Sequence, residues 1–318
     1  MIPISEIHAA QRRIAGHVVP TPVAHDERLG AWLKWESRQL THSFKPRGAL
    51  NKVLSLDRAG LDRGLIACSA GNHGQGTALA ARIAGSRVAV YVPAGAAQIK
   101  IDKMLALGAE VIRVPGQYGD AEAAAIIAAR EQGRTYVSPY NDPLVMAGAG
   151  TIGLEWLAQT PALDILLIPV GGGGLIAGAG SAAKALRPGI KIIGVQSEAS
   201  AYLHAEFHRR DMSAVVEVPT LTDGLAGSIE PGSATIGLIH EVADDVLLVT
   251  EEEIERAIAY AFQRHGEVVE GSAAVVLAAA LAGRVAPAGE IGLLITGGNI
   301  DAAAHARICA GMVTSSKP

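Results

Sequence analysis

The sequence predicts an α/β fold built from largely parallel sheets with helices on both faces. Three observations lead to this prediction. Short runs of β-branched and other apolar residues alternate with Ala-rich helical segments along most of the chain. Apolar residues make up 49% of the 318 residues, which is enough for a substantial core. Glycine occurs 37 times, and the informative glycines lie where predicted strands lead into helices.

The predicted strands and helices follow one another along the chain. We expect strands at residues 65–68, 88–92, 111–114, 165–168, 192–195, 245–249 and 291–295. We expect helices at residues 76–84, 98–107, 120–132, 175–186 and 251–264. Thr250 and Glu253 form a capping-box pattern that predicts the start of the last of these helices. The uncharged stretch 165–183 contains Pro169 and a glycine run, which predict strand, turn and helix instead of a membrane span.

Composition excludes several classes of function. The chain has 27 basic and 31 acidic residues and no basic stripe, so we expect no nucleic-acid partner. Two cysteines, Cys68 and Cys309, form neither a disulfide framework nor a cysteine metal cluster. His204 and His208 lie four residues apart without an evident third ligand, which indicates a solvated helix face and no metal. No signal-peptide pattern is present, so we expect a soluble, cytoplasmic protein with no membrane partner.

A glycine run follows one predicted strand and opens the next predicted helix: Gly171, Gly172, Gly173 and Gly174. Consecutive glycines let several backbone N–H groups converge on one anion, and the helix N-terminus adds partial positive charge. The run therefore predicts a phosphate site, with a purely structural turn as the alternative. The spacing from Gly172 through Gly174 to Ala177 also fits a dinucleotide fingerprint, with Glu198 as a possible ribose ligand. An NAD-dependent oxidoreductase is therefore the alternative from another class of function.

Lys45 lies in the most distinctive segment of the chain, residues 43–49. It is flanked by Phe44 and Pro46, and Arg47 follows two residues on. A partly desolvated amine near a second cation loses its proton more easily, which a Schiff-base lysine requires. We expect Arg47 to be that second cation. The alternative is an ordinary surface lysine.

Five motifs occur in an order that resembles the fold type II pyridoxal-phosphate (PLP) enzymes. They are residues 34–49, 69–76, 171–174, 270–273 and 296–299. Within this superfamily the sequence resembles the threonine/serine dehydratase and serine racemase branch, over essentially the whole chain. The resemblance implies a tryptophan-synthase-β-like architecture of two α/β domains with PLP in the cleft, and a homodimer. It places the large domain at residues 1–53 and 146–318 and the small inserted domain at residues 54–145.

The resemblance also implies roles for single residues. Lys45 would bind the cofactor covalently and later move the α-proton of the substrate. Phe44 would lie against the cofactor ring, and Asn72 would hydrogen-bond its 3′-oxygen. Thr296 would face the pyridine nitrogen, and Glu270 would lie near the ring. The glycine run Gly171, Gly172, Gly173 and Gly174 would hold the phosphate, and the loop of Ser69, Ala70, Gly71, Asn72 and His73 would receive the carboxylate of an amino-acid substrate.

The implied reaction is β-elimination from a β-hydroxy amino acid of the threonine or serine type, giving a 2-keto acid and ammonia. An amino-acid racemase acting on serine is the alternative within the cofactor class. Ala70 stands where the racemases carry a serine as a second acid/base, which favours the dehydratase. Gln196 and Tyr202 replace carboxylates of the family's divalent-cation site, so we expect no metal there. His42 and Ala149 also depart from the family pattern, which leaves the substrate side chain open.

Overall fold

A six-stranded sheet forms the larger part of the fold. Its strands, in spatial order, are β1 (Val23–Asp26), β2 (Ala31–Trp35), β10 (Glu290–Ile295), β7 (Leu163–Pro169), β8 (Lys191–Ser197) and β9 (Asp245–Val249). β1 runs antiparallel to β2, and every other neighbouring pair is parallel. The computed structural model describes residues 1–286 and 289–315, the last four of them by backbone alone.

A four-stranded sheet forms the smaller part of the fold. Its strands, in spatial order, are β5 (Glu110–Val114), β4 (Val88–Pro93), β3 (Leu65–Cys68) and β6 (Thr135–Tyr136), and all of its neighbouring pairs are parallel. Since parallel strands need crossover connections, helices occupy both faces of each sheet.

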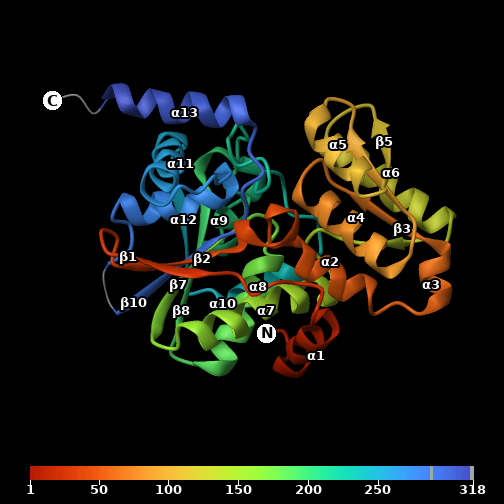
Figure 1. Ribbon diagram of the computed structural model, residues 1–318, viewed down its shortest axis with the longest axis horizontal. Helices are drawn as coiled ribbons and strands as arrows, with labels where there is room; N and C mark the ends of the chain where they lie inside the picture. The colour runs from red at the N-terminus through yellow and green to blue at the C-terminus, as the bar shows by residue number, and fades with distance from the viewer. Residues whose placement is uncertain (287–288, 316–318) are drawn as a thin grey trace.

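The described α-helices are α1 (Ile4–Ile14), α2 (Lys45–Val53), α3 (Arg58–Arg63), α4 (Asn72–Ala84), α5 (Gln98–Ala106), α6 (Tyr118–Glu131), α7 (Pro143–Gln159), α8 (Gly174–Leu186), α9 (Tyr202–Phe207), α10 (Ala234–Val242), α11 (Glu251–His265), α12 (Gly271–Leu281) and α13 (Ala302–Ser315). Short 3-10 helices span Glu36–Arg38, Leu40–His42, Glu198–Ser200 and Met212–Ala214. In Figure 1 the four-stranded sheet lies on the right with α3 to α6, and the six-stranded sheet lies on the left.

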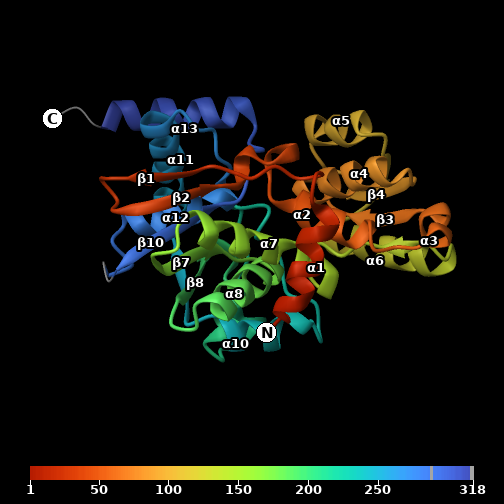
Figure 2. The same cartoon turned by 60° about the horizontal axis from the view of Figure 1, so that its bottom comes forward.

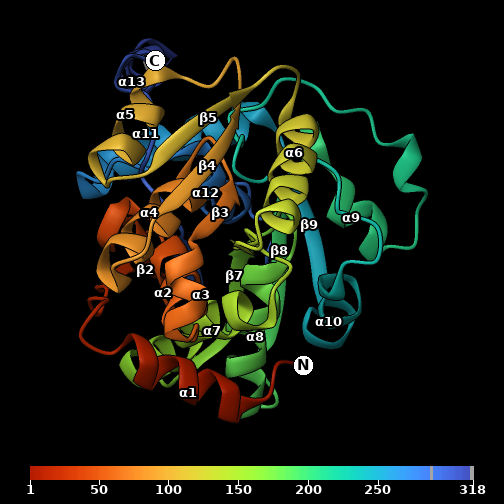
Figure 3. The same ribbon diagram turned by 90° about the vertical axis from the view of Figure 1, so that its right-hand side faces the viewer.

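Each sheet separates two apolar cores. In the six-stranded sheet, α11 and α12 pack on one face and α7, α8 and α10 on the other, as Figure 2 shows. In the four-stranded sheet, α2, α4 and α5 pack on one face and α6 on the other (Figure 3). Within the described ranges, no helix is long and apolar enough to cross a membrane.

The predicted elements can be compared with these. All seven predicted strands are present as β3, β4, β5, β7, β8, β9 and β10, and all five predicted helices are present as α4, α5, α6, α8 and α11. The capping box of Thr250 and Glu253 is also confirmed. β1, β2 and β6 were not predicted. β2 carries the charged Lys34 in its interior, and β6 has only two residues.

The domain boundaries remain a prediction. The four strands of the smaller sheet come from residues 65–136, within the predicted insert. Helix α2 precedes the predicted boundary at residue 54, but it packs on α4 in the core of the smaller sheet. α2 also crosses α7 at very close range. A Cβ atom on Gly148 would lie 2.5 Å from the carbonyl oxygen of Arg47, and one on Gly48 would lie 2.8 Å from that of Val145. Glycine at these two positions therefore allows α2 to lie this close to α7, and the position of Lys45 depends on that distance.

Candidate active site

Lys45 is the first residue of α2, and its amine is partly buried. Its Nζ atom donates a hydrogen bond to the carbonyl oxygen of Pro139 at 2.9 Å and lies 5.0 Å from the centroid of the Phe44 ring. Burial lowers the pKa of this amine to about 8, although the nearby Glu270 acts in the opposite direction. An amine with such a pKa is available in its neutral, nucleophilic form near neutral pH.

The segment from Thr296 to Gly298 lies directly beside the lysine segment. The Phe44 N–H donates to the carbonyl oxygen of Thr296 at 3.1 Å, and the Gly298 N–H donates to that of His42 at 3.0 Å. Ser43 and Gly297 form an isolated antiparallel bridge between these two contacts. Two motifs separated by about 250 residues in the sequence are thereby held together by backbone hydrogen bonds.

Asn72 and Glu270 meet next to Gly297. The Nδ2 atom of Asn72 donates to Oε1 of Glu270 at 2.6 Å, and Nδ2 of Asn299 donates to Oδ1 of Asn72 at 2.8 Å. A Cβ atom on Gly297 would overlap the carboxyl group of Glu270, so glycine is required there. Burial raises the pKa of Glu270 to about 7, and the charge of Asp223 acts in the same direction.

The glycine run forms the turn from β7 into α8. The first backbone hydrogen bond of α8 runs from the Ala177 N–H to the carbonyl oxygen of Gly173 at 3.0 Å, so the preceding N–H groups are not used within the helix. Gly173 has a φ of +87°, which glycine adopts without strain. A Cβ atom on Gly172 would lie 2.5 Å from the Tyr140 ring. The turn is therefore a compact group of N–H donors suited to an anion.

The loop from Ser69 to His73 connects β3 to α4. Its Gly71 N–H donates to the hydroxyl of Ser69 at 3.1 Å, and the side chain of Ala70 is partly exposed. Nε2 of His73 lies 2.8 Å from the carbonyl oxygen of Val137, and burial, together with the charge of Lys45, lowers the pKa of His73 to about 3. His73 is therefore a neutral imidazole that donates to a backbone carbonyl.

Contacts connect most of the predicted cofactor-site residues. Lys45, Phe44, Thr296, Asn72 and Glu270 are connected through the contacts above, and Pro139 and Tyr140 link Lys45 to the glycine run. Pro139, Tyr140 and Asn299 were not predicted as site residues. Asn299 belongs to the motif at residues 296–299, which could have identified it. No local pattern identifies the Pro139 carbonyl group or the Tyr140 ring as a neighbour of the distant site residues.

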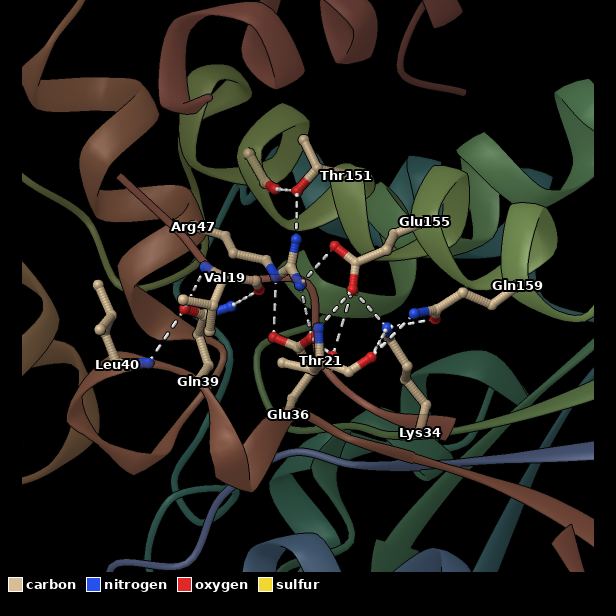
Figure 4. A network of polar contacts seen from close by, with 11 residues as sticks. Val19, Thr21, Lys34, Glu36, Gln39, Leu40, Arg47, Thr151, Glu155 and Gln159 are labelled. Atoms are coloured by element: carbon tan, nitrogen blue, oxygen red, sulfur yellow. Dashed lines mark hydrogen bonds and ion pairs between the residues drawn. The ribbon is translucent and has the colours of Figure 1, made fainter. Parts of the chain in front are cut away.

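Arg47 corrects one expectation, because it is not the cation that lowers the pKa of Lys45. Its guanidinium lies on the other side of α2, where Nε and Nη2 donate to the carboxylate of Glu36 at 2.8 and 2.7 Å and Nη2 also donates to Glu155 at 2.9 Å. Figure 4 shows this network, which Lys34 and Thr21 complete. Burial alone lowers the pKa of Lys45.

The site fits the cofactor that the resemblance implies. PLP carries an aldehyde, a phosphate and a pyridine ring. Lys45 would supply an amine for the aldehyde, and the turn before α8 would supply N–H groups for the phosphate. Thr296, a residue that is 4% exposed, would supply a neutral hydroxyl for the ring. Two buried polar atoms close to these groups, Oγ of Ser43 and Nδ1 of His73, have no partner among the described residues.

The other candidate residues have structural partners. Oε1 of Gln196 accepts a hydrogen bond from the His204 N–H at 3.0 Å. The rings of His204 and His208 lie 4.4 Å apart at the end of α9. Within the part of the chain that the structure describes, no group of three or more His, Cys, Asp and Glu side chains could hold a metal ion. The absence of a metal site remains a prediction.

Known proteins share the fold and much of the sequence. The family of pyridoxal-phosphate dependent enzymes matches residues 14–297. The L-threonine ammonia-lyase of Thermotoga maritima is 40% identical over 307 residues, which cover 95% of this chain and 76% of that protein. The catabolic L-threonine dehydratase of Escherichia coli is 37% identical over 309 residues, which cover 94% of each chain.

Solved structures agree with these relatives. Maize serine racemase superposes with a TM-score of 0.88 at 28% identity, covering 98% of each chain. Threonine deaminase isoform 2 from Solanum lycopersicum superposes with a TM-score of 0.86 at 31% identity, covering 96% of this chain and 91% of that one. These matches leave the dinucleotide interpretation of the glycine run without support. The chain belongs to the pyridoxal-phosphate dependent enzymes, in their threonine/serine dehydratase branch, and is a PLP-dependent lyase.

Proposed function

We propose that this lyase removes the β-hydroxyl group of L-threonine, giving a 2-keto acid and ammonia. It would act in the same way on L-serine, which has a shorter side chain. The observation that carries the proposal is the amine of Lys45, whose lowered pKa of about 8 gives it a larger neutral, nucleophilic fraction near neutral pH than an ordinary lysine has. The L-threonine ammonia-lyase and dehydratase relatives, at 40% and 37% identity, support threonine as the substrate.

Lys45, Phe44, Asn72, Glu270, Thr296 and the glycine run from Gly171 to Gly174 would hold the cofactor. When bound, PLP withdraws electrons from the α-carbon of the amino acid so that its proton can leave. The amine of Lys45 accepts that proton, which requires the neutral form that its lowered pKa provides. Thr296 presents a neutral hydroxyl to the ring nitrogen, where a carboxylate would keep the nitrogen protonated.

The loop from Ser69 to His73 would bind the substrate carboxylate. It runs into the first turn of α4, which begins at Asn72, where backbone N–H groups have no intrahelical partner and the helix dipole favours an anion. Ala70 is partly exposed there and offers no side-chain donor. The loop therefore orients the amino acid through its main chain.

Elimination rather than racemisation is the outcome that these residues favour. A racemase needs a proton donor on each face of the same carbon. Ala70 carries a methyl group, and His73, with a pKa of about 3 and Nε2 on the Val137 carbonyl, holds no proton that it could release near neutral pH as an acid. Only the amine of Lys45 is then left as an acid/base among these groups.

A substrate panel tests the proposal. The purified holoenzyme is incubated with L-threonine, L-serine, 3-hydroxyaspartate and phenylserine, and 2-keto acid and D-amino acid are measured together. We expect the fastest keto-acid release from L-threonine, and D-serine formation slower than pyruvate formation by about 10²-fold or more, the usual contribution of a general acid. Faster turnover of another substrate would refute the specificity, and equal rates of D-serine and pyruvate would refute the elimination. Ala70→Ser should raise D-serine formation.

The oligomeric state and location belong to the same proposal. We expect a cytoplasmic homodimer with no nucleic-acid or membrane partner. Light scattering on the eluting holoenzyme measures the first of these, and a monomer mass would contradict it.

A further inference from the structure

A chain of side-chain hydrogen bonds runs from helix α5, beside the four-stranded sheet, to the centre of the candidate active site. Nζ of Lys103 donates to Oδ1 of Asn299 at 2.8 Å. Nδ2 of Asn299 donates to Oδ1 of Asn72 at 2.8 Å and to the carbonyl oxygen of Thr41 at 2.7 Å. Nδ2 of Asn72 donates to Oε1 of Glu270 at 2.6 Å. No step of the proposed reaction accounts for Lys103 or Asn299.

The chemistry of its members fixes the direction of this chain. The Lys103 ammonium group can only donate, so Asn299 must turn its Oδ1 toward it. The Thr41 carbonyl can only accept, which holds Nδ2 of Asn299 on the opposite side. Oδ1 of Asn72 is then the matching acceptor, and its Nδ2 points to Glu270. An amide has two N–H donors, so Asn72 keeps one donor that the chain does not use.

We infer that Asn299 is a positioning residue that holds the amide of Asn72 with an N–H directed at the 3′-oxygen of the cofactor, and that Lys103 anchors Asn299 in this orientation. The inference rests on the proposed contact between Asn72 and that oxygen. Reversal of the Asn72 amide would place an oxygen against an oxygen, which removes a hydrogen bond and adds repulsion. The geometry of helix α5 is therefore coupled to the electronic state of the bound cofactor.

Helix α5 offers a matched control. Lys100 lies one turn before Lys103 and pairs with Asp223 in the segment between α9 and α10, and the two charges act on Glu270 in opposite directions. Lys100 joins the same two parts of the molecule without touching Asn299 or Asn72. If Lys103 only tethers α5, then removing Lys103 and removing the Lys100–Asp223 pair should have the same effect. If Lys103 orients the amides, then only its removal should alter the cofactor.

The test follows the visible absorption of the holoenzyme against pH, and the dissociation constant of PLP from the resolved protein, in five variants. Asn299→Asp keeps the shape and the contact with Lys103 but removes the donor to Asn72. We expect it to shift the midpoint of the absorption change by about one pH unit and to weaken PLP binding about tenfold, the effect of one hydrogen bond to a charged group. Lys103→Met should shift both in the same direction by less, and Lys103→Arg should keep both at the values of the unmodified protein. The double variant Lys100→Met/Asp223→Asn removes two charges that act on Glu270 in opposite directions, and it should leave both values nearly unchanged.

Asn72→Ala distinguishes the contact between Asn72 and the cofactor from the positioning role of Asn299. An unchanged absorption titration in Asn72→Ala would refute the proposed contact of Asn72. A shift in Asn72→Ala with none in Asn299→Asp would overturn the positioning role alone. Equal shifts in Lys103→Met and in Lys100→Met/Asp223→Asn would overturn the anchoring role of Lys103. Thermal melting of each variant confirms that it is folded, and Asn299→Ser replaces Asn299→Asp if that protein is not.

Discussion

Lys45 and Arg47 are two cations on the same helix turn, and their surroundings differ completely. Lys45 has a neutral carbonyl oxygen as its hydrogen-bond partner, and burial lowers its pKa to about 8. Burial also acts to lower the pKa of Arg47, but the carboxylates of Glu36 and Glu155 outweigh it and raise that pKa above its ordinary value. Two residues apart in the sequence, one cation can lose its proton and the other cannot.

The carboxyl groups show the same contrast. Glu270 lies beside an amide and near a second acid, and its pKa is raised to about 7. Burial acts to raise the pKa of Glu155 as well, but Arg47 and Lys34 hold it below its ordinary value. Burial therefore has no fixed consequence for a charged side chain, since the partner decides between a reactive group and a structural one.

The largest expected effect removes the reactive cation. Lys45→Ala should lower turnover by about 10³-fold or more, because it deletes both the proposed point of cofactor attachment and the proposed base. The folded state should survive, since only one side chain in a partly open site is lost. Turnover and the thermal melting curve of the purified variant measure the two effects. Borohydride reduction of the unmodified holoenzyme should attach the cofactor to the peptide containing Lys45, and attachment at Lys52 would contradict the assignment.

Removal of the structural cation should have the opposite pattern. Arg47→Met leaves the Glu36 carboxylate fully buried, with only the Thr21 hydroxyl as a remaining side-chain partner shown here. The free energy of unfolding should fall by about 3–5 kcal/mol, while turnover per folded molecule is largely kept. Urea denaturation measures the first quantity. The double variant Arg47→Met/Glu36→Gln removes both charges and should recover part of the loss; no recovery would mean that packing, and not charge, dominates.

The smallest expected effect is on pH dependence. A neutral amine is needed to bind the cofactor aldehyde, so the rate of PLP uptake by the apo-protein should rise about tenfold per pH unit below pH 8 and level off above it. Stopped-flow absorbance across this range gives the midpoint. A midpoint near 10.5, the ordinary value for lysine, would show that the amine of Lys45 is not desolvated.

Much of the fold could be predicted because its signals are local. The mostly apolar run at residues 245–249 identifies a buried strand by itself. Thr250 and Glu253 cap the next helix because each side chain accepts a hydrogen bond from the backbone N–H of the other residue. β2 escaped prediction because Lys34 interrupts its apolar pattern. That lysine is fully buried through its contacts with Glu155 and Gln159, which lie more than 120 residues away in the sequence.

The sequence by itself determined the parallel α/β class, the glycine turn before α8 and the identity of the lysine segment, because spacing, glycine and residue order are local properties. Only the tertiary structure decided which way each charged side chain faces. Arg47 seemed a partner for Lys45 by sequence distance, yet the helix turns its guanidinium to Glu36 and Glu155. The hydrogen-bond partners of a buried ionisable group come from distant segments, here Pro139 for Lys45 and Asn72 for Glu270, and no local pattern encodes that contact.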